Sequence, residues 1–441
     1  MRLFYFLIIL LLFQNCSFDN KTGIWKNDNI SSDKKNDLFK DFEDLTISNK
    51  SFSDTIIIKE SFKFSLPNSK INDSWKDIFY SKSNNSENFR YSDSNRLYLK
   101  SKKLSKFEVN NYILFDKNHL IATDVRGNII IFSVDQNKVI SKFNFYKNKY
   151  KKVKKSLNII LENDILYVTD NIGYLYALNY VENKIIWAKN YNVPFRSNLK
   201  IFQNKLIASN QNNNLFFFNK NNGSTLKSIL TEETIVKNNF INNLSIKNNT
   251  LFFLNTYGSL YSINIKKMSI NWIINLNPSL DVSSNNLFFG NKIVYHEDFL
   301  SVSSNKTTYI IDSESGTIIH KKNFSSFLKP IMIDNYLFLI TKNDLLIAMD
   351  LVSGEIIYSY DINKKIADFL DTKKKKAIFK NFAILNENIY IFLNNSYVLK
   401  LNANGSIIDI YQFDAKIKTK PIFIDSSIIF VDEKKRVIIV N

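Results

Sequence analysis

Short runs in which apolar and polar residues alternate follow one another along most of this chain. The clearest stretch is TDNIGYLYALNYVENKIIW, Thr169 to Trp187, where two alternating runs flank a polar turn and the second run ends in Trp. Alternation with a period of two is the pattern of a half-buried strand. Asn between two such runs tolerates the left-handed backbone of a tight turn. The stretch therefore predicts a β-hairpin.

The same register recurs along the chain when it is aligned on Gly173. The eight positions equivalent to Gly173, which we call heads, are Gly127, Gly173, Asn213, Gly258, Lys306, Asp344, Ser396 and Lys435. Successive heads lie between 38 and 52 residues apart, and repeats of about 40–50 residues are typical of four-stranded propeller blades. The pattern predicts an all-β fold, an eight-bladed β-propeller that occupies residues 66–441.

Two further positions of the repeat support this register. Six residues after every head but the first stands Asn or Asp, and Asn or Gly occupies most of the turns ten residues after it. Fourteen residues after the head stand Trp187, Trp272 and Tyr358. We expect these large rings to pack between adjacent blades.

The last repeat, SIIFVDEKKRVIIVN, supplies two strands and lacks an outer one. An unpaired strand edge favours aggregation, and native proteins close or cover it. Near the N-terminus, INDSWKDIFY (Ile71–Tyr80) places Trp75 after a polar run, as in the outer-strand pattern. We therefore expect this segment to close the ring by pairing with the C-terminal blade, and Trp75 to pack between blades.

The N-terminal segment has the pattern of an export signal. Arg2 precedes an apolar run, Leu3 to Phe13, which is too short for a membrane span but suits a signal peptide. The run ends close to Cys16, the single cysteine, in a setting that resembles a bacterial lipoprotein signal. The prediction is a signal peptide over residues 1–15 and lipidation of Cys16. Phe13, Gln14 and Asn15 depart from the usual lipobox, and an uncleaved anchor or an ordinary secreted protein are the alternatives.

Residues 16–65 are polar and rich in Asn, Asp, Ser and Lys, and we interpret them as a tether. No segment of helical period of any length interrupts the repeats, so we expect no helix among them. The longest connectors are Thr231–Asn243 and Asp361–Phe379. Long loops on one face of a propeller are the first place to look for partner contacts.

Composition narrows the possible functions. The formal net charge is +18, which would suit an anionic surface, but the lysines are mostly scattered and no nucleic-acid-binding module accompanies them. We therefore expect no nucleic-acid partner, and interpret most of the Lys excess as compositional. A lone cysteine leaves no internal disulfide or thiolate metal cluster.

Catalytic signatures are missing from the sequence. His119, His296 and His320 are scattered, and only His296 has carboxylates beside it, Glu297 and Asp298. Three consecutive loop residues do not converge on one metal ion, so a solvated loop is the expected role. No phosphate-binding Gly-rich loop and no nucleophile elbow is present. We predict no catalytic residue, no metal site and no enzymatic activity.

The repeat resembles that of PQQ-like β-propellers, in which Asp, Gly, Leu-Tyr-Ala-Leu-Asn, Gly and Trp recur at set spacings. Thr169–Trp187 matches it closely, whereas VSGEIIY and ESGTIIH keep the turn and lose the Trp. Quinone dehydrogenases of this fold are expected to have a calcium ion held by carboxylates, a catalytic Asp and commonly a vicinal cysteine pair. The cysteine pair is absent here, so the resemblance implies no quinone cofactor.

The signal, tether and propeller together resemble the BamB family of outer-membrane β-barrel assembly lipoproteins. This resemblance implies a non-catalytic scaffold at the periplasmic face of the outer membrane that binds the periplasmic domains of BamA and assists outer-membrane protein clients. Ser17 after the lipidated cysteine would fit outer-membrane sorting. The family's apolar-Arg contact motif is not reproduced in Thr231–Asn243. The residues themselves suggest a partner contact through Ile235, Val236 and Lys237, or alternatively a cover for a blade edge.

Two other functions share the predicted fold. A periplasmic quinoprotein-like or solute-binding propeller would hold a small molecule near the ring axis, and a bound calcium ion or quinone would identify it. An envelope adhesion propeller would differ only in its partner. Affinity purification from membranes separates these functions from a role in barrel assembly.

Overall fold

The computed structural model describes residues 16–18, 25–27, 51–146, 150, 152–233, 241–277, 288, 290–304, 306–326 and 328–441. The chain divides into two compact units, residues 1–50 and 51–441. In the first unit β1 (Cys16–Phe18) pairs antiparallel with β2 (Trp25–Asn27). No helix in the described part of the chain is both long and apolar enough to cross a membrane.

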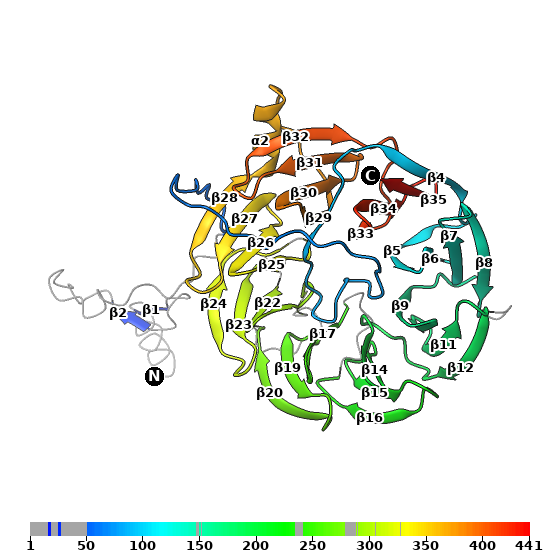
Figure 1. Cartoon of the computed structure of the whole chain (residues 1–441). Coiled ribbons are helices and arrows are strands. Elements are labelled where there is room, and N and C mark those ends of the chain that lie inside the picture. Colours follow the sequence, from blue (N-terminus) through cyan, green and yellow to red (C-terminus); the bar gives the residue numbers. More distant parts are fainter. Residues whose placement is uncertain are drawn as a thin grey trace, which may run out of the picture. The chain divides into compact units, whose positions relative to one another are not determined.

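The second unit is a ring of eight sheets (Figure 1), antiparallel except for the parallel pairing of β3 with β29, which confirms the predicted eight-bladed β-propeller. Each blade begins with its innermost strand. Blade 1 consists of β5 (Val109–Asp116), β6 (His119–Asp124), β7 (Asn128–Ser133) and β8 (Lys138–Asn144), and blade 2 of β9 (Leu157–Glu162), β10 (Ile165–Asp170), β11 (Tyr174–Asn179) and β12 (Lys184–Asn190). Blade 3 consists of β13 (Lys200–Phe202), β14 (Lys205–Ser209), β15 (Leu215–Asn219) and β16 (Thr225–Ile229), and blade 4 of β17 (Asn243–Lys247), β18 (Thr250–Leu254), β19 (Ser259–Asn264) and β20 (Ser269–Asn275).

Blades 5 to 8 repeat this arrangement, with additions from the N-terminal part of the chain. Blade 5 consists of β21 (Val294–His296), β22 (Phe299–Ser303), β23 (Thr308–Asp312) and β24 (Ile318–Lys322), and blade 6 of β25 (Ile331–Ile333), β26 (Tyr336–Ile340), β27 (Leu345–Asp350) and β28 (Ile356–Asp361). Blade 7 consists of β29 (Phe379–Leu385), β30 (Asn388–Leu393), β31 (Tyr397–Leu401) and β32 (Ile407–Gln412), with β3 (Asn88–Phe89) added beside β29. Blade 8 consists of β33 (Ile422–Ile424), β34 (Ser427–Val431), β35 (Arg436–Val440) and β4 (Leu97–Lys103).

Burial explains the two kinds of strand seen in the sequence. The second and third strands of a blade are covered on both faces by neighbouring blades, and β7 is buried at every position. Outer strands such as β12 alternate between exposed and half-buried residues. Strands buried on both faces have nearly continuous apolar sequences, whereas half-exposed strands alternate.

The heads of the repeat are turn positions with a left-handed backbone. Seven of the heads, all except Lys306, are found with positive φ, and the backbone of Lys306 adjoins a residue outside the described ranges. In blade 2, Asp170 accepts hydrogen bonds from the amides of Ile172, Gly173 and Tyr174 at 2.7–2.8 Å. A side chain that binds its own turn in this way stabilises the turn and fixes the register of the hairpin. The repeat therefore reflects a local folding requirement.

The ring closes by pairing β4 with β35, the third strand of blade 8. An N-terminal strand does pair with the C-terminal blade, as predicted, but the strand is Leu97–Lys103. The assignment of Ile71–Tyr80 and Trp75 to this role is wrong. Trp75 is instead buried near the ring axis, with only 6% of its surface exposed. There it packs against Tyr80 and Phe89.

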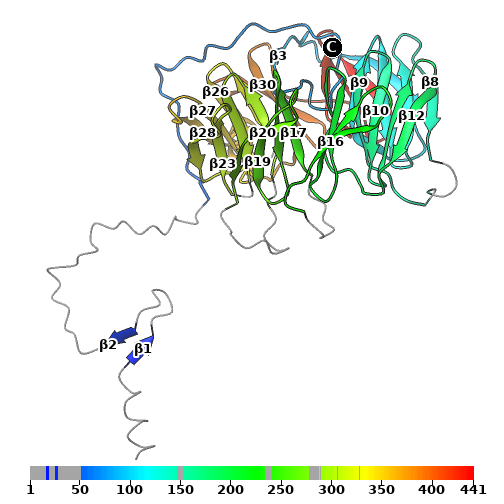
Figure 2. The same ribbon diagram turned by 90° about the horizontal axis from the view of Figure 1, so that it is seen from below.

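Residues 70–91, which we call the cap segment, lie across the axis of the ring at one face (Figures 1 and 2). The segment contacts the innermost strand of each blade, or the turn that follows that strand, in the order of the ring. The pairs, from blade 8 through blades 1 to 7, are Asn72–Phe423, Trp75–Phe115, Lys76–Leu161, Ser81–Lys200, Lys82–Ile246, Ser83–Tyr295, Asn85–Met332 and Phe89–Asn386. One short segment thus bonds to all eight blades.

The compact unit begins at Ser51, so residues 51–65, which the sequence assigned to the tether, contact the propeller. Ile56 exchanges two backbone hydrogen bonds of 3.0 Å with Ser359 of β28. Phe64 packs edge-on against Tyr336, with ring centroids 4.9 Å apart. These apolar residues extend the core of blade 6 to the N-terminal chain.

The connector Asp361–Phe379 contains a helix, contrary to the expectation that none interrupts the repeats. Helix α2 (Ile362–Phe369) is capped by Asp361, which accepts a hydrogen bond from the amide of Lys364 at 3.0 Å. Ile362, Asn363 and Ala367 are its buried residues. Two turns held by a cap and a few buried side chains are too short for a helical period to stand out in the sequence.

Adjacent blades meet where an outer-strand ring covers a glycine of the next blade. The ring of Trp187 lies over Gly223 and donates a hydrogen bond from Nε1 to the carbonyl of Lys220 at 3.1 Å. Trp272 lies over Gly316 in the same way, as do His320 over Gly354 and the Tyr358–Tyr360 pair over Gly405. Blades 1 and 3 have no large ring at this outer-strand position, where Ser141 and Lys227 stand. The equivalent turns of the next blades carry Asn183 and Met268 in place of glycine. Glycine thus stands where a large ring covers the turn.

We predict that Gly223→Ala lowers the free energy of unfolding by about 2–4 kcal/mol. Gly223 has φ +71°, and a Cβ there would come within 2.4 Å of the Trp187 ring. Urea denaturation measures the loss.

Asn183→Ala is the matched control at the equivalent turn. It replaces a residue with φ +55°, and the preceding blade has Ser141 at the position equivalent to Trp187, so the substitution should cost only about 1 kcal/mol. The cost of Gly223→Ala should also shrink in a Trp187→Ala background. Equal costs at Gly223 and Asn183 would contradict the packing argument.

Candidate functional site: a basic well beside the ring axis

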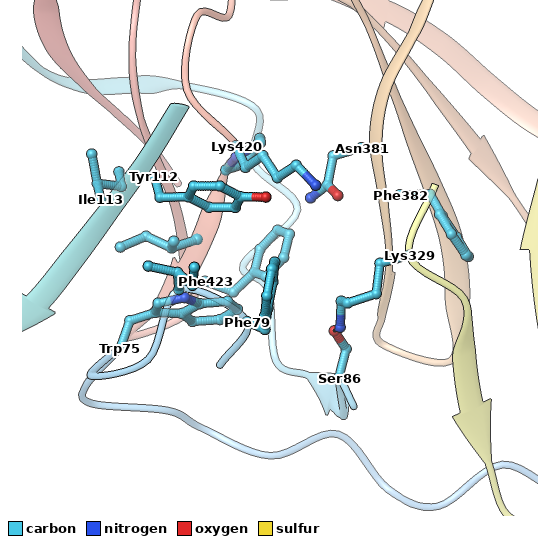
Figure 3. Close-up of a pocket in the computed structure, with 13 residues that line it drawn as sticks. Trp75, Phe79, Ser86, Tyr112, Ile113, Lys329, Asn381, Phe382, Lys420 and Phe423 are labelled. Carbon is cyan, nitrogen blue, oxygen red and sulfur yellow. The ribbon is translucent and has the colours of Figure 1, made fainter. Parts of the chain in front are cut away.

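The main candidate site is a cavity beneath the cap segment, which we call the basic well. It is walled by aromatic and apolar residues of the cap segment and of blades 1, 7 and 8, with Lys329 and Lys420 among its lining residues (Figure 3). Its full lining is Trp75, Ile78, Phe79, Ser86, Tyr112, Ile113, Lys329, Asn381, Phe382, Lys420, Pro421, Ile422 and Phe423. The space between them measures about 470 Å³, including the part open to solvent.

Repeat geometry places three lysines at one level of the ring. Lys292, Lys329 and Lys420 each stand two residues before the first residue of an innermost strand, in blades 5, 6 and 8. The hairpin registers of the other blades put Tyr112, Asn158, Asn198, Asn243 and Asn381 at the equivalent position. The inner wall of the ring therefore carries a layer of polar side chains, of which three are cations.

The cap segment supplies one carboxylate to this part of the ring, that of Asp77. Asp77 pairs with Lys200 of β13 at 2.6 Å, and the two side chains are 8% and 0% exposed. Lys200 Nζ also donates to the carbonyl of Ser81 at 2.9 Å, and Asp77 accepts from the amide of Phe79. This ion pair is satisfied on both sides, so it leaves the other lysines without a counter-charge.

Those other lysines, Lys292, Lys329 and Lys420, contact neutral groups among the described residues. Lys329 Nζ donates to the carbonyl of Asn84 at 2.5 Å and to Ser86 Oγ at 2.8 Å. Lys292 lies over the Phe79 ring at 5.4 Å, and Lys420 lies over the Tyr112 ring at 5.4 Å. The ammonium groups of Lys292 and Lys420 make no hydrogen bond or ion pair with any residue that the structure describes.

Burial and mutual repulsion destabilise the charged form of these lysines. Burial, with repulsion from Lys420 as the second cause, lowers the pKa of Lys292 to about 8. Burial lowers the pKa of Lys329 to about 7, with Lys420 and Lys200 adding to the effect and Asp77 opposing it. Desolvation disfavours a charged amine, and a nearby like charge acts in the same direction. The well thus places lysine side chains where burial and neighbouring positive charge disfavour the ammonium form.

The sequence-based site residues are dispersed. Cys16 lies in β1, in the unit formed by residues 1–50. Ile235, Val236 and Lys237 lie outside the described residues. Trp187, Trp272 and Tyr358 lie in outer strands against the next blade, and Trp75 lines the basic well.

The histidines do not form a site. His119 of blade 1 lies near Tyr180 of blade 2, with ring centroids 6.1 Å apart, and His320 covers Gly354. His296 stays 3.8 Å from Glu297. In the described ranges, no three His, Cys, Asp or Glu side chains come together as metal ligands. The lysines of the well are also unsuited to a calcium-held group.

Sequence reasoning missed the basic well, although a signal was available. Lys329 and Lys420 both stand in a Lys-Pro-Ile triplet, and Lys292 stands in Lys-Ile-Val, each just before an innermost strand. Aligning the repeats on their first strands as well as on their heads would have brought the three lysines into one column.

The fold and the repeat define the protein as an eight-bladed β-propeller of the PQQ-like class. The family model described as "Outer membrane protein assembly factor BamB" (PQQ_2) matches residues 125–360, more than half of the chain. The chain therefore belongs to this family of PQQ-like propellers. The comparison with curated proteins gives no significant match.

Solved structures with the same fold include both non-enzymes and enzymes. BamB from Moraxella catarrhalis is 13% identical with a TM-score of 0.62, over 78% of this chain and 100% of that one. Quinohemoprotein alcohol dehydrogenase from Comamonas testosteroni is 9% identical with a TM-score of 0.62, over 84% and 81%. A europium-containing methanol dehydrogenase is 9% identical with a TM-score of 0.62, over 83% and 89%. At these identities the likeness shows the fold alone.

We predict that Lys200→Met destabilises the propeller by about 3–5 kcal/mol, because it leaves Asp77 buried without its counter-charge. Urea denaturation measures this loss. The double variant Lys200→Met/Asp77→Asn should recover most of it, since Asn still accepts from the amide of Phe79.

Lys117→Met is the control, because its ion pair with Asp164 is exposed on both sides. It should change stability by less than about 1 kcal/mol. A double variant as unstable as Lys200→Met would show that the lost charge pair is not the cause.

Proposed function

We propose that this protein is a non-catalytic scaffold lipoprotein of outer-membrane β-barrel assembly, held at the periplasmic face of the outer membrane through Cys16. The observation that carries the proposal is the family match over residues 125–360, whose description names an outer-membrane protein assembly factor. The partners would be the periplasmic domains of BamA, together with outer-membrane protein clients.

The geometry of the ring is consistent with a partner on the face opposite the cap segment. Innermost strands run toward the cap segment, because its hydrogen bonds reach Phe115, Leu161 and Ile246 near the ends of their strands. The connectors between blades precede those strands, and therefore lie toward the other face. The described ends of one such connector, residues 231–233 and 241–243, flank Ile235, Val236 and Lys237 in the sequence.

The described ends of that connector are fixed to the ring. Glu232 accepts hydrogen bonds from Asn255, Ser259 and Tyr261 at 2.6–2.7 Å. Asn242 donates to Ser209 Oγ at 2.8 Å. Blades 3 and 4 therefore hold both ends of the connector, as expected of a loop that a rigid scaffold presents to a partner.

We expect an Ile235→Asp/Val236→Asp double variant to lose co-purification with the barrel-assembly subunit, because two charges would enter an apolar contact. Affinity purification from solubilised membranes, followed by quantification of that subunit, measures the loss. The control is Ile57→Asp, an exposed apolar residue of the N-terminal segment that precedes the cap segment.

Ile57→Asp should retain the subunit as the wild type does. The contact assignment is falsified if the double variant recovers as much of the subunit as the wild type. Failure of the wild type itself to recover any barrel-assembly subunit would contradict the scaffold function.

Cys16→Ser should release the protein from the membrane, because a serine at this position accepts no diacylglycerol through a thioether. Fractionation of envelopes and labelling with a fatty-acid analogue measure the change. Ser17→Ala is the matched control and should stay labelled and membrane-bound. Equal labelling of the Cys16→Ser variant and the wild type would show that Cys16 is not the anchor.

A quinoprotein-like dehydrogenase is the second candidate function, since two of the similar structures are such enzymes. The lysines around the well weigh against it, because they repel the divalent cation that would hold a quinone. Calcium together with a quinone absorbance in the purified protein would favour this second function.

A further inference from the structure

Two lysines, Lys329 and Lys420, line the basic well, and Lys292 lies over the ring of Phe79, which also lines it. Lys329 and Lys420 come from separate blades, and Asp77 of the cap segment already pairs with Lys200. In Figure 3 the amino end of Lys420 lies beside Asn381, while Lys329 points at Ser86 from the other side of the cavity. Like charges around one partly enclosed space repel one another, and a compact ion of negative charge would relieve this repulsion.

The neighbouring polar groups would also suit such an ion. Ser86 Oγ and the Asn381 amide both line the cavity, and each can donate a hydrogen bond to an oxygen atom. Aromatic walls, Trp75, Phe79 and Tyr112, exclude water from the sides of the cavity. Charge-assisted hydrogen bonds in such a setting are about twice as strong as neutral ones.

We propose that the basic well binds a small divalent oxyanion, of the sulfate or inorganic phosphate type, between Lys329 and Lys420. The anion would link blades 6 and 8 and would neutralise charge beneath the cap segment. This site is independent of the proposed scaffold function, because it lies inside the ring and uses none of the connector residues.

Binding should weaken as the pH rises from 6 to 9. Lys329 and Lys292 have pKa values of about 7 and 8, so both lose their protons within this range, and the charge that attracts the anion falls. The charged groups that act on these two lysines are Lys420, which acts on both, and Lys200 and Asp77, which act on Lys329. The loss of lysine charge therefore sets the direction of the pH dependence.

The test is calorimetric titration of the purified full-length protein with sodium sulfate at constant ionic strength, maintained with sodium chloride. Sulfate keeps its charge between pH 6 and 9, so a change in affinity comes from the protein. We expect one site per chain, weaker affinity at pH 9 than at pH 6, and proton uptake on binding near pH 8. Titrations in two buffers that differ in ionisation enthalpy measure that uptake.

Lys420→Met and Lys329→Met should each weaken sulfate binding by about tenfold or more, because each removes a charged partner. Of the two variants, Lys420→Met should disturb folding less, since the Lys420 ammonium makes no hydrogen bond with the described residues. Lys434→Met, an exposed lysine of the β34–β35 turn, is the control and should bind as the wild type does.

Two results would overturn the proposal. One is the absence of any sulfate binding to the wild type at pH 6. The other is equal binding by the wild type, Lys420→Met and Lys329→Met, which would place the anion elsewhere. Circular dichroism of each variant distinguishes lost binding from lost folding.

Discussion

The propeller depends on the hydrogen bonds that tie residues 70–103 to the rest of the ring. A propeller has no covalent closure, so its first and last blades stay together only if some segment joins them. Here β4 completes blade 8, and the cap segment adds a bond to each blade around the axis. Buried backbone groups require partners, and the cap segment supplies them to strands whose inner edges face the axis.

This mode of closure also determines where a ligand could reach the interior. Because the cap segment covers the axis at one face, the space beneath it is bounded by Trp75 and Phe79 on that side. The lysines before the innermost strands then extend into a space with few acids. A partner protein on the connector face and a small anion in the well would therefore occupy different parts of the same ring.

Sequence predicted the fold wherever the local pattern and the tertiary requirement coincide. The head turns recur because each hairpin needs a left-handed residue, as at Gly173 and Asn213, and this need is visible in one repeat at a time. Closure was assigned to the wrong segment because Trp75 imitates the outer-strand Trp, while the true strand, LYLKSKK, carries no such mark. The well was missed because Lys329 and Lys420 are 91 residues apart and line one cavity only in the closed ring.

The pairing of rings with glycines explains why the Trp of this repeat is no sign of a cofactor. Trp187 and Trp272 face Gly223 and Gly316. Where the outer strand has Ser141 or Lys227 instead, the equivalent turn of the next blade carries Asn183 or Met268. An aromatic side chain needs the space that a missing Cβ leaves, so the outer-strand residue and the turn residue vary together within one chain. A cofactor near the axis would make no such demand on outer strands. The Trp residues are therefore explained by blade packing, and ligand chemistry in this protein has to be sought in the basic well.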